Sequence, residues 1–153
     1  MKLILLLIPF SLLIFSCGKT SLYNKSIQFE NNEWKQKTRP TFVVYIPDTV
    51  NTYDFTLTIR TTTDYKFNNI WLFLNTKTPS NQEVREPYEI KTTFPNGAWV
   101  GKKTGTIVEH QLIFKRRKLP SKGKYTFMIE QGVTQKVLED ILDISFNVTI
   151  AED

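Results

Sequence analysis

Cysteine and histidine are almost missing from this chain of 153 residues, which has one of each. One cysteine cannot form a disulfide within the chain, and one of each cannot build the thiolate and imidazole clusters that bind zinc or iron. We therefore predict no metal site. Strong net charge is missing too, since 20 basic and 15 acidic residues give +5, or +4 once Lys2 is removed with residues 1–16. This mild excess permits contact with acidic lipid or an acidic partner, and it does not predict nucleic-acid binding.

A long hydrophobic run is also missing. Residues 3–15 form an apolar run of 13 residues, about 20 Å of helix, which is shorter than the ~30 Å hydrocarbon core of a bilayer. Lys2 precedes this run and Ser16 and Cys17 follow it. The arrangement predicts a secretory signal peptide rather than a spanning helix. The chain as a whole, with 41% hydrophobic and 23% charged residues, has the composition of one folded domain.

The single cysteine stands where a bacterial lipoprotein needs it. Ile14, three places before Cys17, and the small Ser16 resemble a lipobox, although Phe15 is bulkier than the usual residue. The alternative is an ordinary signal peptide with an incidental cysteine. The resemblance implies cleavage between Ser16 and Cys17 and acylation of Cys17, and two or three acyl chains anchor a protein stably on a membrane. We expect a signal peptide at residues 1–16, a lipid-anchored tether at 17–25 and a β-sandwich domain at 26–153.

Alternation of apolar and polar residues predicts an all-β domain organised around residues 53–74. Tyr53, Phe55 and Leu57 share one face of the first run, which is typical of a strand with one side on a core. The second run, 70–74, is apolar at every position and predicts a strand covered on both sides. We expect the two to pair as the antiparallel centre of a sheet. Further strands are predicted within residues 27–29, 42–46, 88–91, 106–114, 125–129 and 142–150.

Seven or eight strands without a long helix predict a single antiparallel β-sandwich, with a closed barrel as the alternative. Two short helical segments are expected beside the strands. One is a single turn at residues 31–34, whose Trp34 packs back on the sheet. The other is about two turns containing Val137, Leu138 and Ile141, whose spacing is helical.

The titratable residues predict no enzyme. His110 lies on an apolar stripe, and no serine stands in a recognisable relation to it, whereas a general base needs a nucleophile within hydrogen-bond reach. We therefore predict a structural histidine. The carboxylate pairs Glu83 and Glu86, and Asp140 and Asp143, can cleave a glycosidic bond only if held about 5–9.5 Å apart across a cleft. Isolated acids in loops are usually solvated, and we predict no glycosidase chemistry.

Aromatic and basic residues supply the candidate contacts. Trp, Tyr and Arg dominate binding hot spots, so Arg60, Tyr65 and Trp99 are predicted partner contacts. Trp71 is a further candidate, although its place inside an apolar run favours packing in the core. A further predicted contact is a basic hairpin end, which can bind an anionic leaflet or an acidic partner. Its alternative is a solvated tip that discourages edge-to-edge aggregation. The basic residues are Lys115, Arg116, Arg117 and Lys118, with Lys122 and Lys124 across the turn.

Several stretches, in their order and spacing, carry a family resemblance. They are Ile-Arg-Thr at 59–61, Asp-Tyr at 64–65, Asn-Ile-Trp-Leu-Phe at 69–73, Pro-Asn-Gly-Ala-Trp-Val-Gly at 95–101, the strand at 123–131 and the terminal strand at 138–150. Together with the lipobox they resemble the gliding-motility lipoprotein GldH family of the Bacteroidetes. The chain departs from the family at 132–135 and is unusually basic at 115–118. The resemblance implies a non-enzymatic envelope lipoprotein without a cofactor, which supports gliding and the associated type IX secretion apparatus.

The resemblance also implies a location and partners. Surface-exposed lipoproteins of the Bacteroidetes resemble one another in having acidic residues just after the cysteine, and residues 18–25 contain none. We therefore favour the periplasmic leaflet of the outer membrane. The expected partners are the membrane, through Cys17, and other gliding and secretion proteins of the envelope. The alternative function is a carbohydrate-binding module of an envelope glycan system, with Trp99 and tyrosines as the sugar platform.

Overall fold

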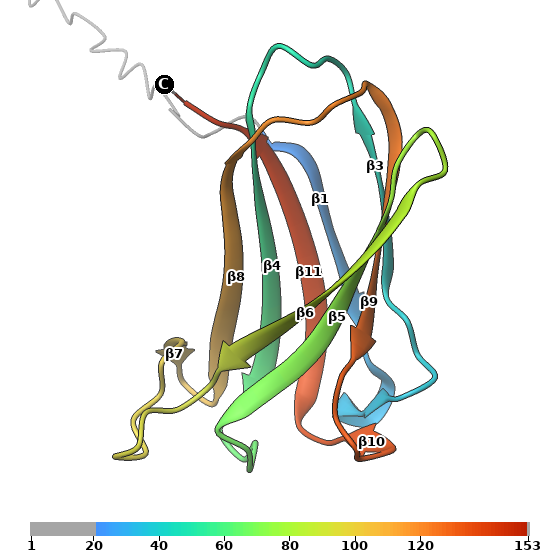
Figure 1. Ribbon diagram of the computed structural model, residues 1–153. Coiled ribbons are helices and arrows are strands. Elements are labelled where there is room, and N and C mark those ends of the chain that lie inside the picture. Colours follow the sequence, from blue (N-terminus) through green and yellow to red (C-terminus); the bar gives the residue numbers. More distant parts are fainter. Residues whose placement is uncertain (1–20, 153) are drawn as a thin grey trace, which may run out of the picture.

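The computed structural model describes residues 21–152, which form two β-sheets packed face to face (Figure 1). The predicted signal peptide, its cleavage site and Cys17 lie outside the described residues. Within the described part of the chain, no helix is long and apolar enough to cross a membrane.

Eleven strands and one 3-10 turn follow one another along residues 21–152. The five-stranded sheet contains, from edge to edge, β1 (Ser21–Gln28), β11 (Ile141–Ile150), β4 (Tyr53–Thr62), β8 (Ile107–Arg117) and β7 (Lys102–Thr104). The four-stranded sheet contains β3 (Thr41–Ile46), β9 (Gly123–Gln131), β5 (Asn69–Lys77) and β6 (Glu83–Lys91). The remaining elements are the pair β2 (Trp34–Lys35) and β10 (Val137–Leu138) and the turn η1 (Glu30–Asn32).

The structure confirms the predicted antiparallel β-sandwich. All strand pairings among the described residues are antiparallel, and the two large sheets remain separate rather than closing into a barrel. Eight strands have six residues or more, while β2, β7 and β10 have two or three. The expected seven or eight strands therefore correspond to the long ones, because a pairing of two or three residues leaves no alternation to detect.

Alternating side chains from both sheets fill one core. Along β4, every odd position from Tyr53 to Thr61 is buried, and the even positions are half-buried on the outer face. Phe127 of β9 and Phe146 of β11 meet between the sheets with ring centroids 4.9 Å apart. Each large side chain buried in this way stabilises the fold by roughly 1.5–3 kcal/mol. The expected turn before Trp34 is present as η1, and Trp34 is fully buried and stacks on Phe29.

The expected pairing within residues 53–74 is wrong. β4 belongs to the five-stranded sheet and β5 to the four-stranded sheet, and residues 63–68 cross from one to the other. Each strand turns its apolar face to the same core from opposite sides. Nor is β5 covered on both sides, because Trp71 is 42% exposed. An apolar run shows that residues are hydrophobic, but it does not show whether another layer covers them.

Three further local expectations are wrong. The predicted helical turns near Val137 are instead β10, a turn with Asp140 at a positive φ of 63°, and the start of β11. A left-handed residue at that point cannot continue a right-handed helix. The basic residues between 115 and 124 do not form a hairpin end. They lead from β8 to β9 across the two sheets, because these strands lie in different sheets.

Residues 21–25, expected in the tether, lie in β1, which pairs with β11 from Ser21 to Gln28. The backbone of an edge strand can pair without an apolar side-chain pattern, so the polar sequence of this segment did not reveal the strand.

Both ends of the described chain lie at one end of the sandwich. Ser21 pairs with Thr149, Ile150 with Tyr53, and Tyr53 with Arg117, so the four outermost positions of neighbouring strands form one row. In Figure 1 the start of β1 and the C-terminus lie together at the top. We call the end with these residues the proximal end, and the opposite end, with η1 and residues 63–68, the distal end.

Candidate interaction site

The residues predicted as partner contacts, among them Arg60, Tyr65, Trp99, Arg116 and Arg117, do not form one surface. Arg60 projects from β4 and pairs across the strands with Asp143 of β11, its Nε donating to both carboxylate oxygens at 3.0 Å and its Nη2 donating to Oδ2. The Asp143 side chain is 2% exposed, whereas the Arg60 side chain is 38% exposed. A charge-assisted bidentate pair of this kind is strong. Arg60 is therefore held in place by a carboxylate of its own chain.

Tyr65 is a structural residue of the distal end. Its side chain is buried, its hydroxyl donates to the carbonyl oxygen of Asn69 at 3.1 Å, and its ring meets the edge of Phe67. Burial raises the pKa of the Tyr65 hydroxyl well above its usual range. The side chain fixes the crossover between β4 and β5 and offers little surface to a partner.

Trp99 and His110 pack together at the distal part of β8. Their ring centroids are 6.1 Å apart, and Trp99 is half-buried on the core. His110 is 1% exposed, and its Nε2 lies 3.1 Å from the hydroxyl of buried Thr61. Burial lowers the pKa of His110 to about 4. A neutral, enclosed imidazole cannot reach a substrate, which agrees with the expected structural histidine. Because Trp99 is half-buried against the core and His110, it offers less surface than the exposed sugar platform expected there.

Three of the four acids in the predicted carboxylate pairs form contacts within the chain. Asp143 is neutralised by Arg60, and Asp140 accepts a hydrogen bond from the Thr62 hydroxyl at 3.0 Å. Glu83 forms an ion pair with Lys77 at 3.3 Å. Among residues 21–152, no three His, Cys, Asp or Glu side chains come together as metal ligands. Of the four acids singled out from the sequence, Glu86 lines a pocket.

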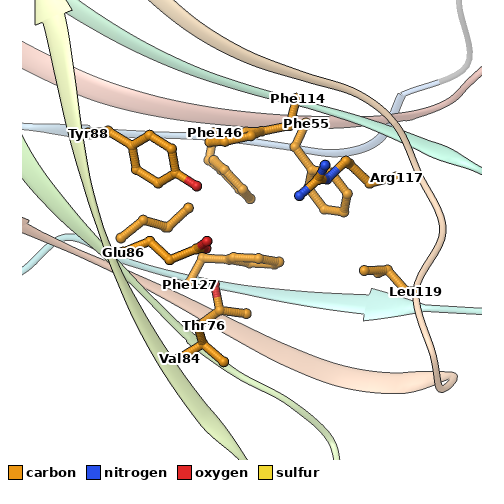
Figure 2. A pocket seen from close by; sticks show the side chains of 11 residues that line it. Phe55, Thr76, Val84, Glu86, Tyr88, Phe114, Arg117, Leu119, Phe127 and Phe146 are labelled. Carbon is orange, nitrogen blue, oxygen red and sulfur yellow. The ribbon is translucent and has the colours of Figure 1, made fainter.

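That pocket lies between the two sheets, with β6 and β8 among its walls, and has a volume of about 200 Å³ (Figure 2). Its deep part is apolar, with Phe55, Phe127 and Phe146 among the residues that line it. The Glu86 carboxylate, the Tyr88 hydroxyl and the Arg117 guanidinium point into the space from its rim, as Figure 2 shows. Burial, with a smaller contribution from Glu86, raises the pKa of Tyr88. The pocket can accept an apolar group with a polar head, and its lining includes no Ser, Cys or His that could act as a nucleophile or base.

A second surface lies on the outer face of the four-stranded sheet. Trp71 is exposed there, and the Arg85 guanidinium stacks 3.4 Å from the centre of the Phe73 ring. Glu130 forms ion pairs with Arg85 at 3.3 Å and with Arg39 at 3.4 Å. We call Trp71, Phe73, Arg85 and Glu130 the outer aromatic face. Stacking and ion pairs restrain Phe73, Arg85 and Glu130, which lowers the entropy that these side chains lose when a partner binds.

The apolar run at 70–74 favoured core packing for Trp71, so the sequence did not predict this face. In the structure Ile70, Leu72 and Leu74 are buried and Trp71 is exposed, an alternation that an unbroken apolar sequence does not reveal. Of the predicted contact residues, Arg116 and Arg117 lie at the proximal end, where Arg117 joins the pocket. The Arg116 amide donates to Asp54 Oδ1 at 2.8 Å, and its guanidinium donates to the carbonyl oxygen of Glu152 at 2.8 Å.

The sandwich is similar to parts of known structures at low sequence identity. It matches tripeptidyl peptidase 2 with a TM-score of 0.47 and 11% identity, over 83% of this chain and 10% of that one. It matches the periplasmic g-type lysozyme inhibitor PliG of Aeromonas hydrophila with a TM-score of 0.38 and 14% identity, over 85% of this chain and 88% of the inhibitor. We infer nothing about function from these likenesses.

Two relatives and a family model resemble the chain in sequence. Over 149 residues the chain is 29% identical to the gliding motility lipoprotein GldH homolog of Christiangramia forsetii, covering 91% of this chain and 90% of that protein. Over 147 residues it is 28% identical to gliding motility lipoprotein GldH of Flavobacterium johnsoniae, with 90% of each chain covered. The family model described as GldH lipoprotein matches residues 21–148, nearly the whole described sandwich. The chain therefore belongs to the GldH lipoprotein family.

Proposed function

We propose that this chain is a non-enzymatic lipoprotein, acylated at Cys17, that supports the gliding-motility and type IX secretion apparatus by binding other proteins of the envelope. The observation that carries the proposal is the match to the GldH lipoprotein family over residues 21–148. The lipobox supports it independently, because the chain has one cysteine and that cysteine follows Ser16 at the end of the signal peptide. The absence of acidic residues in 18–25 supports the periplasmic leaflet of the outer membrane.

The geometry supports binding rather than catalysis. His110 is buried and neutral, and Asp143 forms an ion pair with Arg60. The outer aromatic face, in contrast, combines an exposed tryptophan with a stacked arginine, and these two residue types are enriched among binding hot spots. We assign the contact with a protein of the gliding machinery to this face. The contact centres on Trp71 and Arg85 rather than on Arg60, Tyr65 and Trp99.

The test is a strain that carries the double variant Trp71→Ala/Arg85→Ala in place of the natural protein. We expect normal protein levels with reduced colony spreading and reduced secretion of type IX cargo. A matched control is Ile113→Ala, which removes an exposed apolar side chain, 46% exposed, from the five-stranded sheet. Full spreading by the double variant, or equal loss in the control, would place the contact elsewhere on the molecule.

Anchoring is tested separately with Cys17→Ala. We expect this variant to lose radiolabelled palmitate and to impair spreading, with the sandwich intact, because the core lies wholly C-terminal to Cys17. Retained palmitate labelling would refute acylation at this residue, and full motility without the lipid would show that the anchor is not needed.

A further inference from the structure

The positive charge of this chain is concentrated in one short segment. Residues 115–124 contain six of the 20 basic residues and no acidic residue. The rest of the chain therefore holds 14 basic residues against 15 acidic ones and is almost neutral. A local excess of this kind attracts an anionic surface much more strongly than the same charge spread evenly over the molecule.

This segment lies at the proximal end of the sandwich. It comprises the end of β8, the crossover and the start of β9, and the crossover passes over the top of the molecule in Figure 1. The pairing of Arg117 with Tyr53 and of Ser21 with Thr149 places β8 three strands away from β1 at this end. At about 4.8 Å per strand, Arg117 and Ser21 are about 14 Å apart along the sheet.

The same end is the one nearest the predicted lipid anchor. Four peptide units separate Cys17 from Ser21, and a fully extended chain spans at most about 3.5 Å per residue, or about 14 Å. A chain acylated at Cys17 therefore keeps the proximal end within about 14 Å of the membrane surface. The distal end is separated from the proximal end by the length of a ten-residue strand such as β4, about 33 Å.

Three acidic groups of the proximal end make contacts within the chain, while the exposed Glu152 lies beside the C-terminus. Asp48 accepts hydrogen bonds from the backbone amides of Val50 and Asn51, Asp54 accepts one from the Arg116 amide, and Glu83 pairs with Lys77.

The lysines of the basic segment, in contrast, are free. Lys118, Lys122 and Lys124 are exposed, and none of the ion pairs found within residues 21–152 involves them. Their ammonium groups are available to an anion outside the chain.

We propose that the proximal end rests on the membrane and that Lys118, Lys122 and Lys124 bind the headgroups of anionic phospholipids. The proposal rests on the anchor at Cys17, which brings these lysines to the surface where such headgroups attract basic residues. Because two or three acyl chains anchor a protein without help, the lysines fix the orientation of the sandwich rather than its retention. Both sheets then stand upright on the membrane, and the outer aromatic face points sideways towards neighbouring proteins.

The experiment isolates the lysines from the lipid anchor. Residues 18–153 contain every strand and the whole buried core of the described sandwich, so this unacylated chain is used with vesicles of phosphatidylcholine, with or without about 30 mol % phosphatidylglycerol. We expect flotation with the anionic vesicles only. The triple variant Lys118→Ala/Lys122→Ala/Lys124→Ala should bind them about 100-fold less tightly, since each basic residue near such a surface contributes roughly fivefold.

The matched control removes the same charge from the distal end, with Lys35→Ala/Lys37→Ala/Lys103→Ala, all three being exposed. In about 0.1 M salt the screening length is about 10 Å, much less than the length of the sandwich, so this variant should bind like the parent. Equal loss in the two triple variants, or equal binding to neutral vesicles, would refute the proposal. No binding to any vesicle would also refute it and would favour an acidic protein as the occupant. The vesicles do not test Cys17 acylation, which palmitate labelling decides on its own.

Discussion

Mild acidification should destabilise this fold through His110. The pKa of the buried imidazole is about 4, against about 6.5 for an ordinary histidine. Because the folded-state pKa is the lower one, the folded state favours neutral His110. The stabilisation is complete above about pH 6.5 and is lost as the pH falls towards 4, since the unfolded chain binds the proton first. Linkage between these two pKa values gives a loss of about 2 kcal/mol by about pH 5 and about 3 kcal/mol by about pH 4.

The assay is urea unfolding followed by tryptophan fluorescence, for the parent and for His110→Gln, from about pH 7.5 to about pH 5, a range in which most carboxylates stay ionised. The glutamine amide can still bond the Thr61 hydroxyl, but it does not titrate. We expect the parent to lose about 2 kcal/mol across this range and the variant to lose much less. An equal pH dependence in both proteins would show that His110 is not responsible.

Three substitutions test the packing. Arg60→Met should destabilise the fold by about 3–5 kcal/mol in urea, because it leaves the buried Asp143 charge unpaired; a loss below about 1 kcal/mol would contradict this account. Gly101→Ala should lower stability by about 1–3 kcal/mol in the same assay, since the added Cβ would lie 2.2 Å from the Glu109 carbonyl oxygen. Phe146→Ala removes a ring that contacts aromatics of both sheets and should lower the Tm by about 10 °C in a thermal scan followed by circular dichroism.

Sequence patterns predicted the strands whose two faces meet different surroundings. In β3, Phe42, Val44 and Ile46 are buried while Val43 and Tyr45 are exposed, as the alternation indicated. Only the end of β1 was predicted, within residues 27–29, because the rest is an edge strand held to β11 by backbone bonds. Its side chains are mostly exposed or half-buried, so its sequence lacks a continuous buried face.

The sheet to which a strand belongs is a property of the whole fold. β4 and β5 follow each other closely in the chain, yet residues 63–68 carry the second strand across the core. The contact residues depend on the same long-range geometry. Arg60 meets Asp143, 83 positions away, and this pairing turned a predicted partner contact into a structural ion pair.

With the acylation proposed at Cys17, β1 is the mechanical link between the lipid and the sandwich. A pull on the anchor enters the described chain at Ser21, where β1 starts at the proximal end, and acts along the strand axis. The hydrogen bonds between β1 and β11, which extend from Ser21 to Gln28, lie across that axis. They therefore carry the load together, in shear, instead of opening one after another from the end. Such a joint resists a pull on the proposed anchor better than a pairing that opens from its end.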